Sequence, residues 1–122
     1  MSSPAANKRK GAAFEIELMK GFREAGFDIE RLRLAGKDDE GDLVIRGGNL
    51  VVRYTVIEAK SGALHPAEFV REARTERLNF AKHRDVPDDN VQAIVIAKAR
   101  GKNWRDAYVL TTVRDYFRLD EL

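Results

Sequence analysis

The sequence predicts an α/β domain, in which helices and strands alternate along the chain. Apolar residues recur at helical spacing over 11–25 and again over 66–82. Two β-branched runs around a glycine turn occupy 41–60, and a third short apolar run occupies 91–97. With 122 residues, of which 43% are hydrophobic, the chain is long enough for one modest core and too short for two.

The N-terminus contains little apolar surface to bury, and Lys8, Arg9 and Lys10 follow it. We therefore expect residues 1–10 to form a flexible basic arm and residues 11–122 to form a single domain. The arm has two interpretations of about equal weight, namely a contact along a phosphate backbone or an ordinary solvated terminus.

The first helix is expected over 11–25, where Phe14, Leu18 and Phe22 form one apolar face. Glu15 lies one residue from the centre of this face, so its carboxylate can reach inward from the flank of the helix. The alternative for Glu15 is a surface acid near a helix N-terminus, where the helix dipole favours carboxylates.

A first strand or extended segment is expected over 27–34, followed by a loop at 35–41. The apolar runs at 41–45 and 50–60 flank the sequence Gly-Gly-Asn at 47–49, a pattern typical of a β-hairpin. Charged residues interrupt these runs at only a few places.

The hairpin brings charged side chains together at one end. Alternate side chains share a face of a strand, so Glu58 and Lys60 are neighbours, and the turn places Asp42 beside Glu58. Two carboxylates about 4 Å apart repel by roughly 4 kcal/mol at an effective dielectric near 20, so this cluster needs a counter-charge. Hard oxygen donors without His or Cys suit Mg²⁺, or Mn²⁺ in its place, rather than Zn²⁺. Lys60 is then well placed beside an attacking water.

The second half begins with Pro66, which fits the first turn of a helix running to about Lys82. Phe69, Ala73 and Phe80 are its expected buried positions. Its arginines, Arg71 and Arg74 among them, suit phosphate contacts, although glutamates on the same helix allow a salt-bridged solvent face with about equal weight. His65 and His83 have no partner that spacing identifies, so both are interpreted as surface or capping residues.

The remaining elements are a buried strand at 91–97, a basic loop at 98–105, a strand at 107–112 and a short terminal helix or extended tail. Trp104 in the basic loop can stack on an unpaired base, or it can pack under the loop. Phe117 and Leu119 in the tail give it an apolar side that can join a partner subunit.

Asp42 followed by Glu58-Ala59-Lys60 at the end of an apolar strand resembles the PD-(D/E)XK nuclease signature, with Gly41 where that pattern often has proline. The segment from Arg9-Lys10-Gly11 to Glu15 is similar to the opening of archaeal-type Holliday-junction resolvases. This resemblance covers residues 8–60 well and the remainder only in the order of elements. One departure is Ile16, since these resolvases often have an arginine directly after the helix glutamate.

The resemblance implies a restriction-endonuclease-like core, with a mixed sheet of about five strands flanked by helices. It implies a magnesium-dependent endonuclease that cleaves DNA four-way junctions as a homodimer. In the family pattern Glu15 is the helix-borne acid and a further candidate metal ligand, Asp42 and Glu58 are the principal metal ligands, the Ala59 carbonyl completes the metal shell, and Lys60 is the catalytic lysine. The candidate DNA-binding residues are Lys8, Arg9, Lys10, Arg31, Arg33, Arg71, Arg74, Lys98, Arg100, Lys102, Trp104 and Arg105, with Arg31 and Arg33 competing for the family's loop arginine.

Two alternatives remain open at this point. One is a nuclease of the same fold that acts on linear, flapped or replication-associated DNA, and the other is a catalytically idle module that binds branched DNA. The formal charge of +2 is mild, so basic patches rather than net charge would bind DNA. The absence of cysteine and of a long apolar run fits an intracellular protein without a membrane segment.

Overall fold

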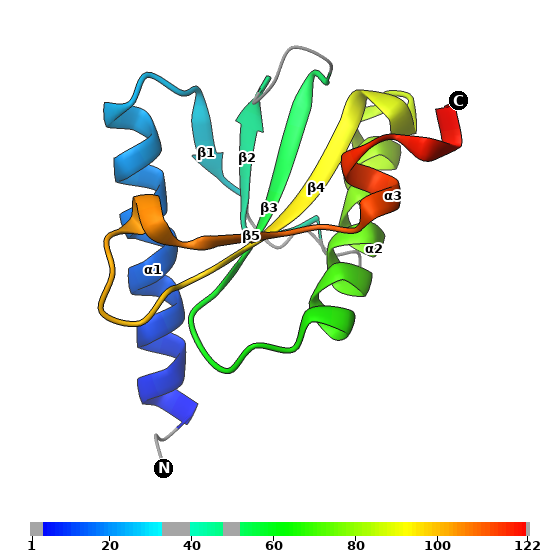
Figure 1. The fold of residues 1–122 in the computed structure, drawn as a ribbon. Helices are drawn as coiled ribbons and strands as arrows, with labels where there is room; N and C mark the ends of the chain where they lie inside the picture. Colours follow the sequence, from blue (N-terminus) through cyan, green and yellow to red (C-terminus); the bar gives the residue numbers. More distant parts are fainter. Residues whose placement is uncertain (1–3, 33–39, 48–51, 122) are drawn as a thin grey trace.

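The computed structural model describes residues 4–32, 40–47 and 52–121, with residues 4–10 described by their backbone (Figure 1). Its elements are α1 (Pro4–Glu24), β1 (Ile29–Arg31), β2 (Leu43–Arg46), β3 (Tyr54–Lys60), α2 (Pro66–Arg84), η1 (Asp88–Asn90), β4 (Val91–Ala97), η2 (Trp104–Asp106), β5 (Tyr108–Leu110), α3 (Val113–Tyr116) and η3 (Leu119–Glu121).

The strands form one five-stranded sheet in the order β1-β2-β3-β4-β5. The pair β3 and β4 is parallel and joined through α2, whereas the other neighbouring pairs are antiparallel. The sheet is therefore mixed, and the predicted α/β class with about five strands is confirmed.

The β2–β3 pair is the expected antiparallel hairpin. Its register sets Leu43 opposite Ile57 and Arg46 opposite Tyr54. Most of the predicted turn at 47–49 lies outside the described residues. The register nonetheless fixes which side chains of the two strands are neighbours, and this relation positions the candidate site.

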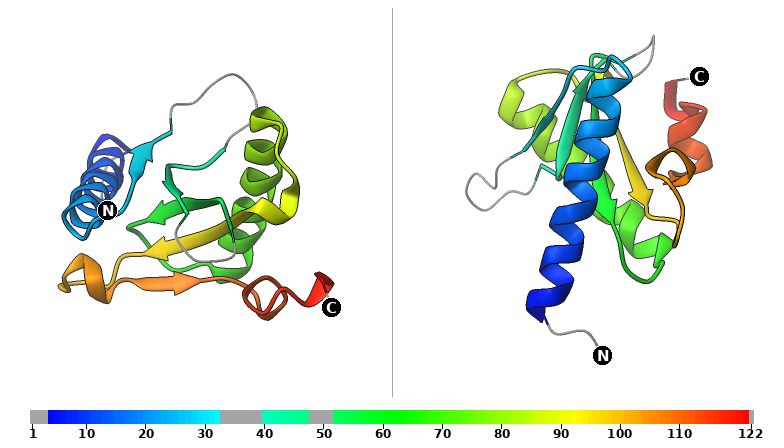
Figure 2. Two further views of the ribbon diagram at one scale, coloured as in Figure 1. Left: turned by 90° about the horizontal axis from the view of Figure 1, so that it is seen from above. Right: turned by 90° about the vertical axis from the view of Figure 1, so that its left-hand side faces the viewer.

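Helices cover both faces of the sheet (Figure 2). On one face α1 contributes Phe14 and Leu18 to a core that also contains Ile57 of β3. On the other face α2 contributes Phe80 to a core that contains Val56. Because Val56 and Ile57 are consecutive in β3, the strand divides its side chains between the two helices. No described helix has the length and apolar character needed to cross a membrane.

The first helix begins at Pro4, earlier than the expected start at residue 11, so the backbone of residues 4–10 is helical. Proline is favoured in the first helical turn, and alanine, lysine and arginine are strong helix formers. These propensities account for the extension. In Figure 1 the N-terminal turns of α1 project beyond the sheet.

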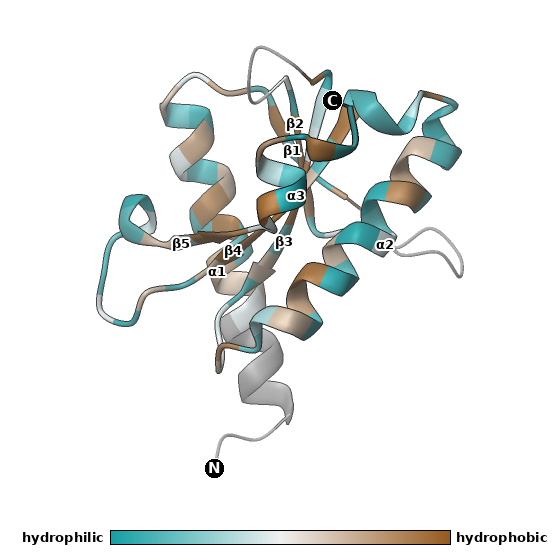
Figure 3. Cartoon of the chain, turned by 45° about the vertical axis from the view of Figure 1, so that its right-hand side comes forward, coloured by the Kyte–Doolittle hydropathy of each residue, from teal (hydrophilic) through white to brown (hydrophobic). Residues whose placement is uncertain are grey.

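The second half follows the expected pattern closely. Strand β4 has the predicted bounds, and Phe69, Ala73 and Phe80 are the buried apolar residues expected in α2. After the short helix α3, Phe117 and Leu119 are exposed, and apolar colour marks parts of this C-terminal segment in Figure 3. The expectation of an exposed apolar side on the tail is confirmed, and its partner remains a prediction.

Trp104 packs within the fold. Its ring centroid lies 4.9 Å from that of Phe22 on α1. A Cβ atom at Gly21 would lie 2.3 Å from the Trp104 ring, so the glycine permits the helix and the indole to meet. Of the two interpretations of Trp104, packing under the loop is the one observed.

Candidate active site

Asp42 is fixed to the edge of β3 by backbone hydrogen bonds. Its N–H donates to the Ile57 carbonyl at 3.0 Å, and its Oδ2 accepts from the Ala59 N–H at 2.8 Å. The carboxylate is therefore held next to Glu58, as the hairpin register predicts. This bond orients one side-chain oxygen toward the backbone of the strand that carries both Glu58 and Lys60.

Gly41 lets the chain enter β2 at close range to α2. Its φ of +107° belongs to the region that favours glycine, and an added Cβ would lie 2.7 Å from Val56 Cγ1 and 3.2 Å from Glu76 Oε2. Proline, the residue often found here in the nuclease signature, has φ fixed near about −65° and could not adopt this conformation. The departure from the signature thus has a structural reason.

Glu58 and Lys60 project from β3 toward α2. The Lys60 Nζ lies 3.3 Å from Glu58 Oε1 and donates to Glu72 Oε2 at 2.9 Å. The Lys60 Nζ also lies over the Phe69 ring, 4.8 Å from the ring centroid. Glu58 is only 8% exposed, and its Oε2 is buried with no hydrogen-bond partner among the described residues. A buried carboxylate oxygen of this kind is costly unless a cation or donor approaches it.

Two glutamates of α2 join this cluster. Carboxylate oxygens of Glu58, Glu72 and Glu76 all lie within 4.8 Å of one another, and among the described residues no other set of three such ligands is this close. Glu76 is 3% exposed, an unusual burial for a glutamate.

From the sequence alone, the glutamates of α2 are expected only to offset the charge of its arginines. A signal for Glu76 was nevertheless present. The buried positions of α2 are Phe69, Ala73, Glu76 and Phe80, at spacings of four, three and four, so Glu76 occupies a position of the apolar repeat. An acid at a core-facing position is a reason to look for a functional partner.

The pKa of Lys60 depends on the carboxylates around it. Burial lowers the pKa of Lys60, but its hydrogen bonds to Glu72 and Glu58 and their negative charges outweigh burial and raise the pKa above its usual value. Lys60 therefore keeps its proton at neutral pH. The Lys60 ammonium contacts Glu58 and Glu72, and in the described part of the chain three carboxylates gather here, a set of ligands that suits a divalent cation.

These donors fit Mg²⁺ or Mn²⁺. All are carboxylate oxygens, and the Oε2 of Glu58 lacks a partner in the described structure.

Glu15 lies on the other side of the sheet. Its helix packs on the face that carries Ile57, and its carboxylate pairs with Arg31 of β1, with Oε2 2.9 Å from an Arg31 nitrogen. No group of three close carboxylates among the described residues includes Glu15. Asp42 is tied to the β3 backbone between Glu58 and Lys60, but neither Asp42 nor Glu15 belongs to the described group of close carboxylates, and the predicted roles of both stay predictions.

The basic loop after β4, which is predicted to bind DNA, begins near the cluster. Strands β3 and β4 are parallel with Lys60 opposite Ala97, and the Lys98 N–H donates to the Lys60 carbonyl at 2.8 Å. The basic loop carrying Arg100 and Lys102 therefore starts beside the cluster. In Figure 1 the β3–α2 connection and the N-terminal turns of α1 lie at the lower end, whereas the loop after β4 runs beside the middle of α1.

The other candidate DNA-binding residues have varied surroundings. Arg71 is exposed on α2, whereas Arg74 pairs with Asp115 at 3.4 Å. Arg105 lies over the Trp104 ring at 5.3 Å. Arg33, and the side chains of Lys8, Arg9 and Lys10, lie outside the described residues. The DNA contacts of all these residues remain predictions.

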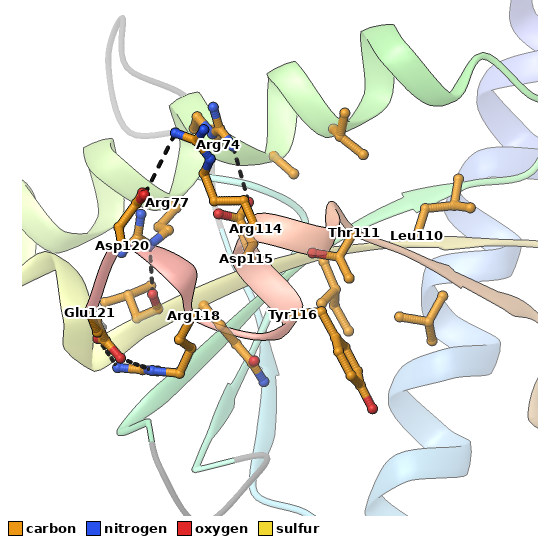
Figure 4. Close-up of a pocket in the computed structure, with 17 residues that line it drawn as sticks. Arg74, Arg77, Leu110, Thr111, Arg114, Asp115, Tyr116, Arg118, Asp120 and Glu121 are labelled. Carbon is orange, nitrogen blue, oxygen red and sulfur yellow. Dashed lines mark hydrogen bonds and ion pairs between the residues drawn. The ribbon is translucent and has the colours of Figure 1, made fainter.

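A cavity of about 360 Å³ lies elsewhere, between α2, β4 and the C-terminal segment (Figure 4). None of the clustered carboxylates lines it. Its arginines are matched, since Arg74 pairs with Asp115, and Arg77 donates to the carbonyls of Val91 and Asp88, both at 2.7 Å. The carboxylate cluster is the better candidate site, because the buried Oε2 of Glu58 accepts no hydrogen bond from the described residues.

No protein-family model and no curated protein matches the sequence significantly. The fold is similar to that of a solved structure of Hjc, a Holliday junction resolvase from the archaeal hyperthermophile Archaeoglobus fulgidus, with a TM-score of 0.50 and 24% identity over 75% of this chain and 71% of that chain. The chain thus has an α/β fold, a five-stranded mixed sheet flanked by helices, consistent with the restriction-endonuclease-like fold of that protein.

Proposed function

We propose that this protein is a magnesium-dependent endonuclease that hydrolyses DNA phosphodiester bonds. The observation that carries the proposal is the contact of Glu58 with Lys60 at one end of the β2–β3 hairpin, where two α2 carboxylates join Glu58 and the Asp42 carboxylate accepts from the Ala59 N–H. A group of carboxylates beside a protonated lysine suits a metal and an anionic substrate together. The similarity of fold to a Holliday junction resolvase supports the same reaction class.

Each residue has a definite task in this proposal. Asp42 and Glu58, with the Ala59 carbonyl, would hold the cation, and the Ala59 N–H keeps the Asp42 side chain oriented. A bound divalent cation supplies Lewis-acid chemistry, polarising the phosphate and making water a competent nucleophile at neutral pH. Lys60 holds its proton and stabilises negative charge developing on the phosphate oxygens.

The proposed substrate is branched DNA, with four-way junctions as the specific form. The basic loop after β4 and Arg71 on α2 would contact phosphates on either side of the cluster. Paired incisions on symmetric strands would require a two-fold homodimer. The exposed apolar residues of α3 and its surroundings offer a surface for the second copy.

The experiment is gel-resolved cleavage of an immobile four-way junction and of a matching linear duplex, each with Mg²⁺ and with chelator. Wild type is compared with Asp42→Asn, and Asp89→Asn serves as the control, since Asp89 is an exposed aspartate in η1 before the start of β4. We expect paired, symmetric, metal-dependent nicks on the junction, at least about 100-fold slower for Asp42→Asn and unchanged for Asp89→Asn.

Other results would reassign the function. Equal cutting of the duplex would keep the active site and move the substrate to linear, flapped or replication-associated DNA. Junction binding that ignores Mg²⁺, without cleavage by a folded protein, would point to a catalytically idle DNA-binding module. A protein that stays monomeric at micromolar concentration when DNA is added would count against paired incision.

A further inference from the structure

The geometry points to Glu72 and Glu76 of α2, rather than Glu15 of α1, as the carboxylates that complete a divalent-cation site with Glu58. We propose this ligand set as a refinement that rests on the proposed nuclease function. It replaces the helix-borne acid that the family resemblance implies with two acids from the helix on the opposite face of the sheet.

Glu58 and the helix that carries Glu15 lie on different faces of the sheet. Glu58 projects to the α2 face of the sheet, where its carboxylate meets those of Glu72 and Glu76 within 4.8 Å. Glu15 instead extends from α1 on the other face and is engaged by Arg31, with the Arg31 Nε donating to its Oε2 at 3.1 Å. To act as a metal ligand, the Glu15 carboxylate would have to give up this ion pair.

The burial of Glu58 is an independent indication that this cluster binds a cation. The Oε2 of Glu58 is buried and accepts no hydrogen bond from the described residues, while its Oε1 meets Lys60 at 3.3 Å. A side chain nine-tenths buried that retains an unmatched anionic oxygen toward two further carboxylates is expected where a cation binds.

The absence of a side chain at Gly41 leaves room for the Glu76 carboxylate. Gly41 approaches so closely that a Cβ there would lie 3.2 Å from Glu76 Oε2. The Glu76 carboxylate is therefore next to the residue that precedes Asp42. Through Glu76, the group of Glu58 and the two α2 glutamates borders the start of β2. One site could therefore take ligands from β2, β3 and α2.

The test measures metal binding without DNA, using the full chain. Free Mn²⁺ is counted by electron paramagnetic resonance during titration, and the rise in Tm on adding Mg²⁺ is recorded for each variant. We expect Glu72→Gln and Glu76→Gln each to weaken Mn²⁺ binding at least about tenfold and to reduce the Mg²⁺-induced rise in Tm. Glu15→Gln and the control Glu68→Gln, an exposed residue of the same helix, should stay within about twofold of wild type.

Glu72 is only half-buried, so Glu72→Gln carries the test if the substitution of buried Glu76 prevents folding. Wild-type affinity in both α2 variants, a comparable loss in Glu15→Gln, or no Mn²⁺ binding by wild type would overturn the ligand set. The outcomes separate from those of the nuclease proposal. Tight Mn²⁺ binding through Glu72 and Glu76 without DNA cleavage would refute only the nuclease, whereas metal-dependent cleavage with Glu15 as the required ligand would refute only this assignment.

Discussion

Helix α2 separates two charged regions of opposite character. Toward β3 it contributes Glu72 and Glu76, whose carboxylates gather with that of Glu58, and the Lys60 ammonium contacts Glu58 and Glu72. Toward β4 and the C-terminal segment it contributes Arg74 and Arg77, which line the cavity. Both regions lie between the same helix and the same sheet, so burial alone does not distinguish them.

The balance of charge does distinguish them. In the cavity each arginine meets an acid or a carbonyl, as Arg118 does with Glu121 (Figure 4) and with the Asp89 carbonyl. At the cluster Lys60 contacts Glu58 and Glu72, and the buried Oε2 of Glu58 accepts no hydrogen bond from the described residues. Matched charges tie the C-terminal segment to the body of the protein, whereas unmatched buried charge has no structural benefit and is retained where a ligand neutralises it.

The largest expected effect is on the one lysine of the acidic region. Lys60→Ala should slow metal-dependent DNA cleavage at least about 100-fold, because it removes the cation that faces the developing charge on phosphorus. Single-turnover cleavage of the junction measures it. Lys82→Ala, which removes an exposed lysine from the last turn of α2, is the matched control and should cleave at the wild-type rate. Full activity of Lys60→Ala would refute its assigned role.

The next effect concerns the close approach that builds the acidic region. Gly41→Ala should destabilise the protein by about 2–4 kcal/mol, combining left-handed backbone strain with overlap against Val56 and Glu76. Gly26→Ala is the control, because Gly26 also has positive φ, +96°, but has open space around its Cα. It should cost only about 1–2 kcal/mol. Urea denaturation gives both values, and equal losses would mean that the contact with Glu76 and Val56 carries no strain.

The local pattern of the chain predicted much of the acidic region. Alternation along β3 makes Glu58 and Lys60 neighbours, and the antiparallel hairpin sets Asp42 beside them. These relations depend on residues close in sequence or joined by a short turn. These relations can therefore be predicted from the sequence without knowing how the helices pack.

Relations that depend on packing between distant elements were not predicted. The flank position of Glu15 on α1 allows contact with either a strand end or Arg31, and only the placement of the helix on the sheet decides between them. The apolar repeat of α2 places Glu76 on the core-facing side, but only the packing of α2 near Gly41 shows what its carboxylate meets. The early start of α1 was missed for a different reason, since residues 4–10 have good helix propensity but no apolar periodicity.

The smallest expected effect concerns two arginines of α2 and tests whether they bind DNA. Arg71 is exposed, whereas Arg74 must leave Asp115 before it can contact a phosphate. In the presence of chelator, Arg71→Ala should weaken junction binding. The fall of log affinity with log salt concentration should become less steep by about 1, as expected for one lost phosphate contact. Arg74→Ala should change the slope less, because breaking the exposed pair with Asp115 offsets part of the gain from a phosphate. Fluorescence anisotropy across a salt series measures both slopes, with Asp115→Asn as the control that frees Arg74. A steeper slope in Asp115→Asn would mean that the ion pair withholds Arg74 from DNA, while an unchanged slope would assign Arg74 to the structural side of the helix.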